Sequence, residues 1–546
     1  MDKRTRLDAE SNRRKPPSAG LNIANATIAD LNRALTCGAI SSSALVASYV
    51  ARIEAYDRQG PRINSLIYLN KAALKEAAQR DRERAMGQSR GPLHGIPIVL
   101  KDNFDAAGMP TTAGSRLLAG HLPSRDAFVV KRLRDAGAII LAKTNMQEFA
   151  GGGGSVMGSR ERQVLQAGTV PSGYSTQGGQ TLNPHDVRYS PSSSSGGTGA
   201  AVAAAFAQFG LGTDTIMSIR GPGSVNGIVG LKPTNGLLSR SGIVPLAPSL
   251  DTAGPMARNI YDTAFALGVM AGVDATDPST ARDAPPHGWP DYIRGLRKGA
   301  LRDSRFGIVQ QFLGTDPEVD EVFHSAVSRM REKGATVMEV RYPDYLLDMK
   351  EGLCSIIMAS EFRAHIADYL ASTGTGFPKS LAELAAAAAD PRRRYPSPEK
   401  AYALRYTEEH ALDLDDPGYL AARHHGMALV RHAVDALFAR HELDALLYPT
   451  LSGTAPRIAA AGTAAPTPYL AMPPSHHSTV IANLSGYPDL TIPIGRTIAG
   501  LPVGMSIFGR AHAEAKLLAY GYDLERPPGT YVLPRHTPAL ESDVLL

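Results

Sequence analysis

The chain has 546 residues, and 43% of them are hydrophobic, which is enough for a large buried core. Its net charge is +5, of which the first 17 residues supply +3 through six basic and three acidic side chains. The remainder is nearly neutral, which argues against a nucleic-acid-binding face, and no stretch reaches the roughly 18 apolar residues of a membrane span.

The N-terminal residues and the cysteines bear on the cellular compartment of the protein. Residues 1–24 are basic and poor in apolar side chains, which predicts a disordered tail. No apolar run typical of a signal peptide stands near residue 1. The spacing of Cys37 and Cys354 fits neither a metal site nor a disulfide framework, so we expect buried free thiols in a cytoplasmic protein.

Helix and strand patterns alternate along the chain. Thr27 is expected to cap a first helix, a second helix is expected after Ser43, and a charged helix over about 71–86. Apolar runs then predict buried strands at 96–100, 305–309, 444–448, 489–493 and 503–508, and further strands are expected at 138–141 and 336–341. Further helices are expected at 127–136, 199–209 and 317–333, with a turn at 211–214 and a helix-rich, polar stretch over 350–440. This alternation predicts an α/β fold with helices on both faces of a sheet.

Two serines and one lysine stand out within this pattern. Ser194 closes a polar serine run, Ser218 follows 24 positions later, and Lys101 ends the expected strand at 96–100. A hydroxyl nucleophile needs a base, and burial can keep a lysine neutral near pH 7 by penalising its charged form. Lys143 and Lys232 are alternative bases on the same argument.

The sequence segments around these three residues are also informative. They are Gly-Pro-Leu-His-Gly-Ile-Pro at 91–97, Ala-Lys-Thr-Asn at 142–145, Gly-Ile-Val-Gly-Leu-Lys-Pro-Thr at 227–234, Asp-Thr-Ala-Gly-Pro-Met-Ala-Arg at 251–258 and Leu-Ser-Gly-Tyr-Pro-Asp-Leu-Thr-Ile-Pro-Ile-Gly at 484–495. With Lys101 and the two serines, they resemble the amidase signature family of serine hydrolases, and within it the bacterial peptide amidase branch.

The resemblance implies a fold and a domain plan. It implies a single large mixed β-sheet covered by helices, in one domain over residues 25–530. The signature core would span about 95–260, the stretch at about 275–440 matches less well, and 531–546 would be a C-terminal tail.

The resemblance also implies a catalytic site. Ser218 would be the nucleophile, Ser194 a bridging serine on a cis peptide bond, and Lys101 the general base. The backbone N–H groups of Thr215, Ile216, Met217 and Ser218 would form the oxyanion hole. The implied reaction is hydrolysis of a small or peptide-like amide through an acyl-enzyme, without cofactor or metal. The expected partner is a small-molecule amide, not a nucleic acid or a membrane, and a homodimer stays open.

Three features depart from the family pattern. Ile216-Met217 and Ser192-Ser193 each stand where the family usually has Gly-Gly, and about a dozen extra residues lie near 155–172 as a tolerated loop insertion. Ile216 would therefore adopt an ordinary backbone conformation in a reshaped loop, or carry strain. Met217 would narrow the pocket and restrict the acyl group.

Alternative readings remain at this point. A degenerate amidase fold retained for binding, or a glutaminase subunit of a transamidation complex, would share most of these motifs. Asp214 and Arg220 are expected to form a structural ion pair, and His94 a structural hydrogen bond. The pairs His424-His425 and His476-His477 lack metal-ligand spacing.

Overall fold

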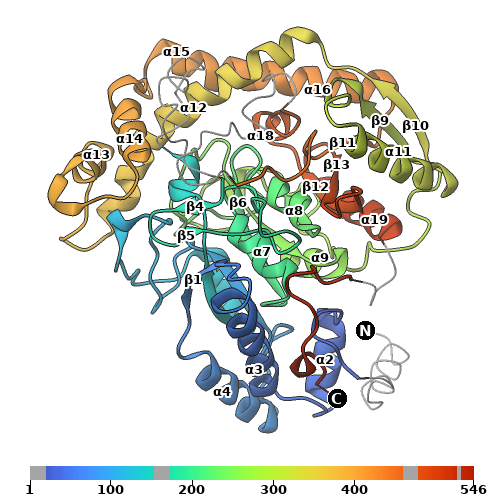
Figure 1. Ribbon diagram of the computed structural model, residues 1–546. Coiled ribbons are helices and arrows are strands. Elements are labelled where there is room, and N and C mark those ends of the chain that lie inside the picture. Colours follow the sequence, from blue (N-terminus) through green and yellow to red (C-terminus); the bar gives the residue numbers. More distant parts are fainter. Residues whose placement is uncertain (1–19, 153–171, 459–476, 526–530, 546) are drawn as a thin grey trace.

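The computed structural model describes residues 20–152, 172–458, 477–525 and 531–545 (Figure 1). Most of the expected basic tail and the expected loop insertion near 155–172 lie outside these ranges, as does His476. The described chain is built on one mixed sheet of eleven strands, surrounded by helices on both faces (Figure 1). The predicted fold class is confirmed.

The strands of this sheet come from almost the whole length of the chain. They are β1 (Leu66–Leu69), β2 (Pro97–Lys101), β3 (Ile139–Thr144), β6 (Phe209–Asp214), β7 (Val229–Lys232), β8 (Thr252–Ala257), β9 (Arg305–Val309), β10 (Thr336–Val340), β11 (Ala445–Pro449), β12 (Asp489–Arg496) and β13 (Pro502–Phe508). Their order across the sheet is β1-β3-β2-β6-β8-β7-β12-β13-β11-β9-β10. A separate two-stranded ribbon pairs β4 (Tyr174–Ser175) with β5 (Gly179–Gln180).

Parallel and antiparallel pairs alternate in blocks across the sheet. β2 is parallel to both β3 and β6, and β9 is parallel to both β10 and β11. The pairs between β6 and β13 are antiparallel. Every residue of β2, β3 and β6 is buried, as expected of parallel strands covered on both faces.

Helices pack around the sheet and at its margins. Those before the middle of the chain are α2 (Ile28–Thr36), α3 (Ser42–Arg52), α4 (Ala73–Ala85), α5 (Phe128–Asp135), α7 (Gly196–Ala203), α8 (Arg220–Asn226), α9 (Ile260–Met270) and α10 (Ser279–Arg282). The later ones are α11 (Pro317–Glu332), α12 (Asp344–Ala371), α13 (Leu381–Ala389), α14 (Pro398–His410), α15 (Pro417–Leu420), α16 (Met427–His441), α18 (Val480–Ser485) and α19 (Glu514–Leu524). The helices α12 to α16 lie together along one side of the molecule (Figure 1).

Most predicted elements occur within a few residues of their expected place, but three differ. Thr27 caps α2 as predicted, whereas α3 begins at Ser42 under a Ser41 cap, because the N–H groups of Ser42 and Ser43 bind Asp81. The helix expected at 199–209 is instead α7, Gly196–Ala203. It ends early because the chain turns at Ala205, where φ is 53°.

The turn expected at 211–214 is wrong, because these residues belong to strand β6. Two glycines make this strand look like a loop in the sequence. A Cβ at Gly210 would lie 2.5 Å from Thr198 Cγ2, and a Cβ at Gly212 would lie 2.9 Å from Ser195 Oγ. The glycines therefore allow α7 and the turn before it to pack directly on β6.

The last described segment, 531–545, packs against the N-terminal helices. The N–H of Leu545 donates to the Leu21 carbonyl, and the N–H of Ile23 donates to the Asp543 carbonyl. Arg52 of α3 forms a fully buried ion pair with Asp543 at 2.5 Å. The two ends of the described chain are thus joined at one side of the fold (Figure 1).

Candidate active site

The three predicted catalytic residues come from adjacent parts of the fold. Lys101 is the last residue of β2, Ser218 lies in the loop between β6 and α8, and Ser194 lies in the turn before α7. Because β2 and β6 are parallel neighbours, their carboxyl ends open at the same edge of the sheet. This is where active sites of α/β folds usually form.

Lys101 and Ser194 are in direct contact. The Lys101 Nζ donates to Ser194 Oγ at 2.7 Å, to Thr213 Oγ1 at 2.7 Å and to the Thr213 carbonyl at 3.2 Å. The lysine is fully buried, and no carboxylate lies within ion-pairing distance of its amine in the described part of the chain. Burial lowers the pKa of Lys101 from 10.5 to about 7, although the charges of Asp214 and Asp251 oppose this.

The alternative lysines are placed differently. The Lys143 Nζ binds the Pro110 carbonyl, Thr111 Oγ1 and the Asp102 carboxylate. The Lys232 Nζ binds the Pro233 carbonyl and Asn235 Oδ1. Burial lowers the pKa of both amines, that of Lys232 to about 7. Low pKa alone therefore does not single out a base, but contact with Ser194 does.

The turn that carries Ser194 contains a cis peptide bond and is held by two backbone hydrogen bonds. The peptide bond between Ser193 and Ser194 is cis, as the family resemblance implied. The N–H of Gln147 donates to the Ser194 carbonyl at 3.1 Å, and the N–H of Ser195 donates to the Ser218 carbonyl at 3.2 Å. The last bond ties the turn directly to the residue expected to be the nucleophile.

Ser192 adopts a left-handed backbone conformation, which glycine adopts more easily. Its φ is +67°, in the left-handed region that glycine adopts without penalty. Its N–H donates to Ser190 Oγ at 3.0 Å. The departure from Gly-Gly at 192–193 therefore leaves the local backbone conformation accessible, at some steric cost.

The loop before Ser218 has ordinary backbone conformation. Neither Ile216 nor Met217 has a positive φ, so the first of the two expectations for Ile216 is the one observed. The N–H groups of Ile216, Met217 and Ser218 donate no hydrogen bond to any described residue. Ser218 is 6% exposed, and its hydroxyl likewise has no hydrogen-bond partner among the described residues. These groups are free to meet a bound molecule.

Two anchors fix the shape of this loop. Thr215 Oγ1 donates to Asp251 Oδ1 at 2.6 Å, and Asp251 in turn accepts from the N–H groups of Leu246 and Ala247. On the other side, Arg220 Nη2 donates to the Ile216 carbonyl at 3.0 Å. Both anchors act on residues next to the unpaired N–H groups.

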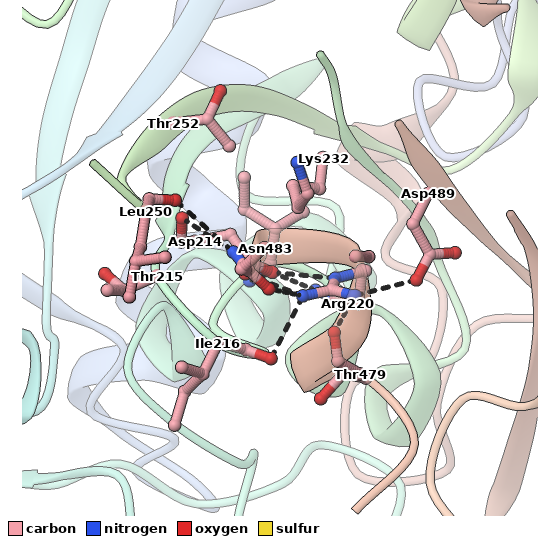
Figure 2. Close-up of polar contacts among 12 residues, drawn as sticks. Asp214, Thr215, Ile216, Arg220, Lys232, Leu250, Thr252, Thr479, Asn483 and Asp489 are labelled. Carbon is pink, nitrogen blue, oxygen red and sulfur yellow. Dashed lines mark hydrogen bonds and ion pairs between the residues drawn. The ribbon is translucent and has the colours of Figure 1, made fainter. Parts of the chain in front are cut away.

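Arg220 is the centre of a buried polar network (Figure 2). Its guanidinium pairs with Asp214 at 2.9 Å and with Asp489 at 2.7 Å, and all three side chains are fully buried. It also donates to the Thr479 carbonyl and to Asn483 Oδ1. Burial raises the pKa of Asp214, but the Arg220 charge and hydrogen bonds outweigh this and lower it to about 2. The expected structural ion pair is present and extends to α18 and β12.

The Met217 side chain belongs to a small apolar cluster next to Ser218. This cluster consists of Met217, Val225, Leu451 and Ala455, with Ile216 and Tyr189 packed against it. A Cβ placed on Gly221 would lie only 2.6 Å from the Met217 Cε, so Gly221 provides the space for this methyl group. Apolar surface thus lies directly beside Ser218.

A cavity of about 480 Å³ is lined in part by the end of the strand that carries Thr213. Its lining includes Asn103, Asp105, Thr213, Thr215 and Asp251. Tyr369 of α12 reaches it and donates its hydroxyl to Asp105 Oδ1 at 2.7 Å. Burial raises the pKa of Asp105 to about 6. Lys101, Ser194 and Ser218 do not line this cavity.

Several residues of the site could not be identified from the sequence. Thr213 contacts Lys101 but was assigned to a turn, and Asn103, two residues after Lys101, donates to Thr213 Oγ1. Asn483 and Asp489 reach Arg220 from about 260 residues away. His94 forms the structural hydrogen bonds that were expected, with the Arg80 carbonyl and the Arg90 N–H.

The described ranges contain neither a metal-binding cluster nor a membrane-spanning helix. No three His, Cys, Asp or Glu side chains there gather in an arrangement that would hold a metal ion. None of the helices in those ranges has both the length and the apolar character needed to span a bilayer.

A lysine and two serines at the edge of one large mixed sheet define a serine-hydrolase architecture, and a model of the amidase family matches residues 44–518. The chain belongs to the amidase family, whose signature motifs it carries, and its reaction is the hydrolysis of amide bonds.

Characterised relatives span almost the full length of the chain. A glutamyl-tRNA(Gln) amidotransferase subunit from Acidothermus cellulolyticus is 36% identical, over 91% of this chain and 94% of that protein. A peptide amidase crystallised with the competitive inhibitor chymostatin is 40% identical, with a TM-score of 0.81 over 92% of this chain and 98% of its own. The native peptide amidase of Stenotrophomonas maltophilia is 39% identical, with a TM-score of 0.78 over the same shares.

Proposed function

We propose that this chain hydrolyses peptide-like amides through an acyl-enzyme on Ser218, with Ser194 as proton relay and Lys101 as general base. The contact of the Lys101 amine with Ser194 Oγ at 2.7 Å carries this proposal. The bond from the Ser195 N–H to the Ser218 carbonyl supports it, because it holds the relay turn against the nucleophile loop. Burial of Lys101 supports it further, because only a neutral amine can act as a base.

The reaction begins with two coupled proton transfers. Ser218 passes its proton to Ser194, and Ser194 passes its own proton to the neutral amine of Lys101. The Ser218 oxygen forms a bond to the amide carbon, and the carbonyl electrons move to the oxygen. The N–H groups of residues 215–218 stabilise this oxyanion; one such donor is typically worth about 100- to 1000-fold in rate.

The intermediate then breaks its carbon–nitrogen bond. The departing nitrogen takes the proton back from Lys101 through Ser194 and leaves as a neutral amine or ammonia. A water molecule next attacks the acyl-enzyme, giving its proton to Lys101 by the same relay. The carboxylic acid is released as Ser218 recovers its proton.

The substrate class follows from the surroundings of Ser218. The apolar cluster around Met217 and Leu451 favours an acyl group with an apolar side chain. Similarity to peptide amidases supports an amide at the end of a peptide or an amino-acid amide. A panel of amino-acid and dipeptide amides, with ammonia release as readout, tests this assignment.

The catalytic roles can be tested without knowing the substrate. The protein is incubated with a fluorophosphonate, which phosphonylates activated serines, and its intact mass is measured. We expect one adduct in the wild type and none in Ser218→Ala or Lys101→Ala. A folded wild-type protein that takes up no adduct would contradict the proposal and favour a degenerate amidase fold retained for binding.

A second candidate is a glutaminase subunit of a transamidation complex. It is favoured by the 36% identity to a glutamyl-tRNA(Gln) amidotransferase subunit over nearly the whole chain. The purified chain should then release ammonia from glutamine in preference to peptide amides, and it should co-purify with other subunits. Preference for peptide amides by the isolated chain would exclude this candidate.

Location and assembly are proposed from the thiols and from the family. Cys37 and Cys354 are free thiols, as is usual in the reducing cytoplasm; Cys354 is buried as predicted, whereas Cys37 is exposed, which corrects the prediction for that residue. Besides the small-molecule amide, a second copy of the chain is the partner we would test, by sedimentation velocity. A single species at the mass of the monomer would exclude a homodimer.

A further inference from the structure

Thr213 places two oxygen atoms against the amine of Lys101. The Lys101 Nζ lies 2.7 Å from Thr213 Oγ1 and 3.2 Å from the Thr213 carbonyl oxygen. Its third partner is Ser194 Oγ at 2.7 Å. Thr213 is 5% exposed and Lys101 is fully buried, so water does not replace these contacts readily.

The number of hydrogen atoms on the amine limits how many of these three oxygen atoms it can donate to. A protonated lysine carries three N–H donors, which match the three oxygen atoms around it. A neutral amine has two N–H groups and one lone pair. To accept the proton of Ser194, it must keep the lone pair for Ser194 Oγ and direct both N–H groups to Thr213.

The hydrogen-bond partners of Thr213 support the donation of both amine N–H groups to this residue. Its carbonyl oxygen can only accept a hydrogen bond, which assigns one N–H of the amine. Its hydroxyl oxygen also accepts a hydrogen bond from Asn103 Nδ2 at 3.0 Å. Because the oxygen accepts from both Lys101 and Asn103, its own hydrogen must point away from these two donors.

We infer that Thr213 is a positioning residue, which holds both N–H groups of neutral Lys101 so that the lone pair of the amine points at Ser194. The inference rests on the proposed roles of Lys101, Ser194 and Ser218. It assigns a role to the strand residue five positions before the nucleophile, and it makes Asn103 a support for Thr213.

The test uses the rate of Ser218 phosphonylation by a fluorophosphonate, followed by intact mass. Thr213→Val keeps the shape of the side chain but removes Oγ1, and we expect the labelling rate to fall about 10- to 100-fold, the usual size of a positioning defect. Thr213→Ser restores the hydroxyl and should recover most of the rate. Thr252→Val is the matched control: Thr252 is 1% exposed, lies on the neighbouring strand and donates only to the Ala253 carbonyl.

The pH dependence provides a readout that separates loss of this hydrogen bond from loss of packing. Thr213 Oγ1 stabilises the charged amine more than the neutral one, so its removal should lower the pKa of Lys101. Thr213→Val should label more slowly above pH 7 because the lone pair of the amine is no longer held toward Ser194, while the midpoint of its pH profile moves to lower pH. A damaged fold that admits water to Lys101 would instead move the midpoint to higher pH.

A double variant separates two causes of a slower rate. Thr213→Val also leaves Asn103 Nδ2 without its acceptor, which could displace the local backbone. If that were the cause, the effect of Thr213→Val would vanish in an Asn103→Ala background. We expect it to persist there, because the contact with Lys101 is still lost.

The outcomes distinguish the inference from the proposed function. A Thr213→Val variant that labels as fast as the wild type, or faster, would overturn the inference, since the Thr213 hydroxyl would then be competing for the lone pair. Loss of labelling in Ser218→Ala and Lys101→Ala would in that case leave the proposed function intact. Labelling that persists in both Ser218→Ala and Lys101→Ala would instead refute the proposed function.

Discussion

At the scale of single residues, Lys101 is the group whose chemistry depends most on its surroundings. The side chain is fully buried, and burial lowers the pKa of its amine to about 7. Below that pH the amine is protonated and cannot accept a proton from Ser194. Above it the neutral amine predominates and can act as a base.

We therefore predict that kcat/KM for amide hydrolysis rises with pH through a midpoint near 7. The physical reason is the growing fraction of neutral Lys101 in the free enzyme. The measurement is a pH–rate profile between about pH 5 and 9, with Lys101→Arg as the control, because arginine stays charged over this range. A midpoint near 10 would show that the amine is solvated and contradict the prediction.

Met217 is the residue most expected to set the acyl preference. Its side chain packs on Gly221, Val225 and Leu451 directly beside Ser218. Met217→Gly removes that surface, so we predict that bulkier acyl groups become substrates and that small ones lose affinity. The measurement is the ratio of kcat/KM for a bulky and a small amino-acid amide. Val225→Ala, in the same cluster, controls for loss of packing, and an unchanged ratio in Met217→Gly would refute the prediction.

At the scale of elements, β6 and α8 hold the nucleophile loop between them, and Arg220 joins the two. Arg220 begins α8, pairs with Asp214 at the end of β6, and supports the Ile216 carbonyl between them. Because Asp489 is also buried, removing the guanidinium leaves two carboxylates without their counter-charge.

We predict that Arg220→Leu lowers the free energy of unfolding by about 3–5 kcal/mol and slows Ser218 labelling as well. The first effect comes from the uncompensated carboxylates, the second from the lost support of the Ile216 carbonyl. Chemical denaturation and fluorophosphonate labelling measure the two. Lys131→Ala is the control, since its ion pair with Asp135 is more than 60% exposed and should contribute less than about 1 kcal/mol. Equal stability losses in the two variants would refute the prediction.

The elements also show where local sequence is ambiguous. The limits of strands β9 and β10 agree with the predicted ones to within one residue. β6, β7 and β8 each contain glycine, and none of them was predicted as a strand, although they form the centre of the sheet. Glycine is required at Gly210 and Gly212 by the close approach of α7, and a pattern of side-chain types does not reveal such an approach.

At the scale of the whole molecule, the C-terminal segment connects with the N-terminal helices. Arg52 donates to the carbonyls of Ala204, Thr537 and Pro538 as well as pairing with Asp543. Residues nearly 500 positions apart therefore share one buried polar contact, and the start of the described chain depends on its end.

We predict that Asp543→Ala destabilises the protein by about 3–5 kcal/mol, because Arg52 is left buried without its counter-charge. Amide exchange should increase at Ile23 and in α3 in the same variant, since they contact the released segment. The measurements are chemical denaturation and hydrogen exchange, with Asp135→Ala, on the surface, as the control. Unchanged exchange at these sites would show that the C-terminal segment does not support them.

The sequence by itself determined the family and the α/β class, and it led to the proposal of Lys101, Ser194 and Ser218 as catalytic residues, because their motifs are local in the chain. It also identified Asp214 and Arg220 as partners, since they lie six residues apart. Only the tertiary structure decided which of three buried lysines meets Ser194, because a low pKa follows from burial and all three are buried. Only it brought Thr213, Asn483 and Asp489 into the site, because strand pairing and the contact of Asn483 in α18 with Asp214 at the end of β6 join residues that are far apart in sequence.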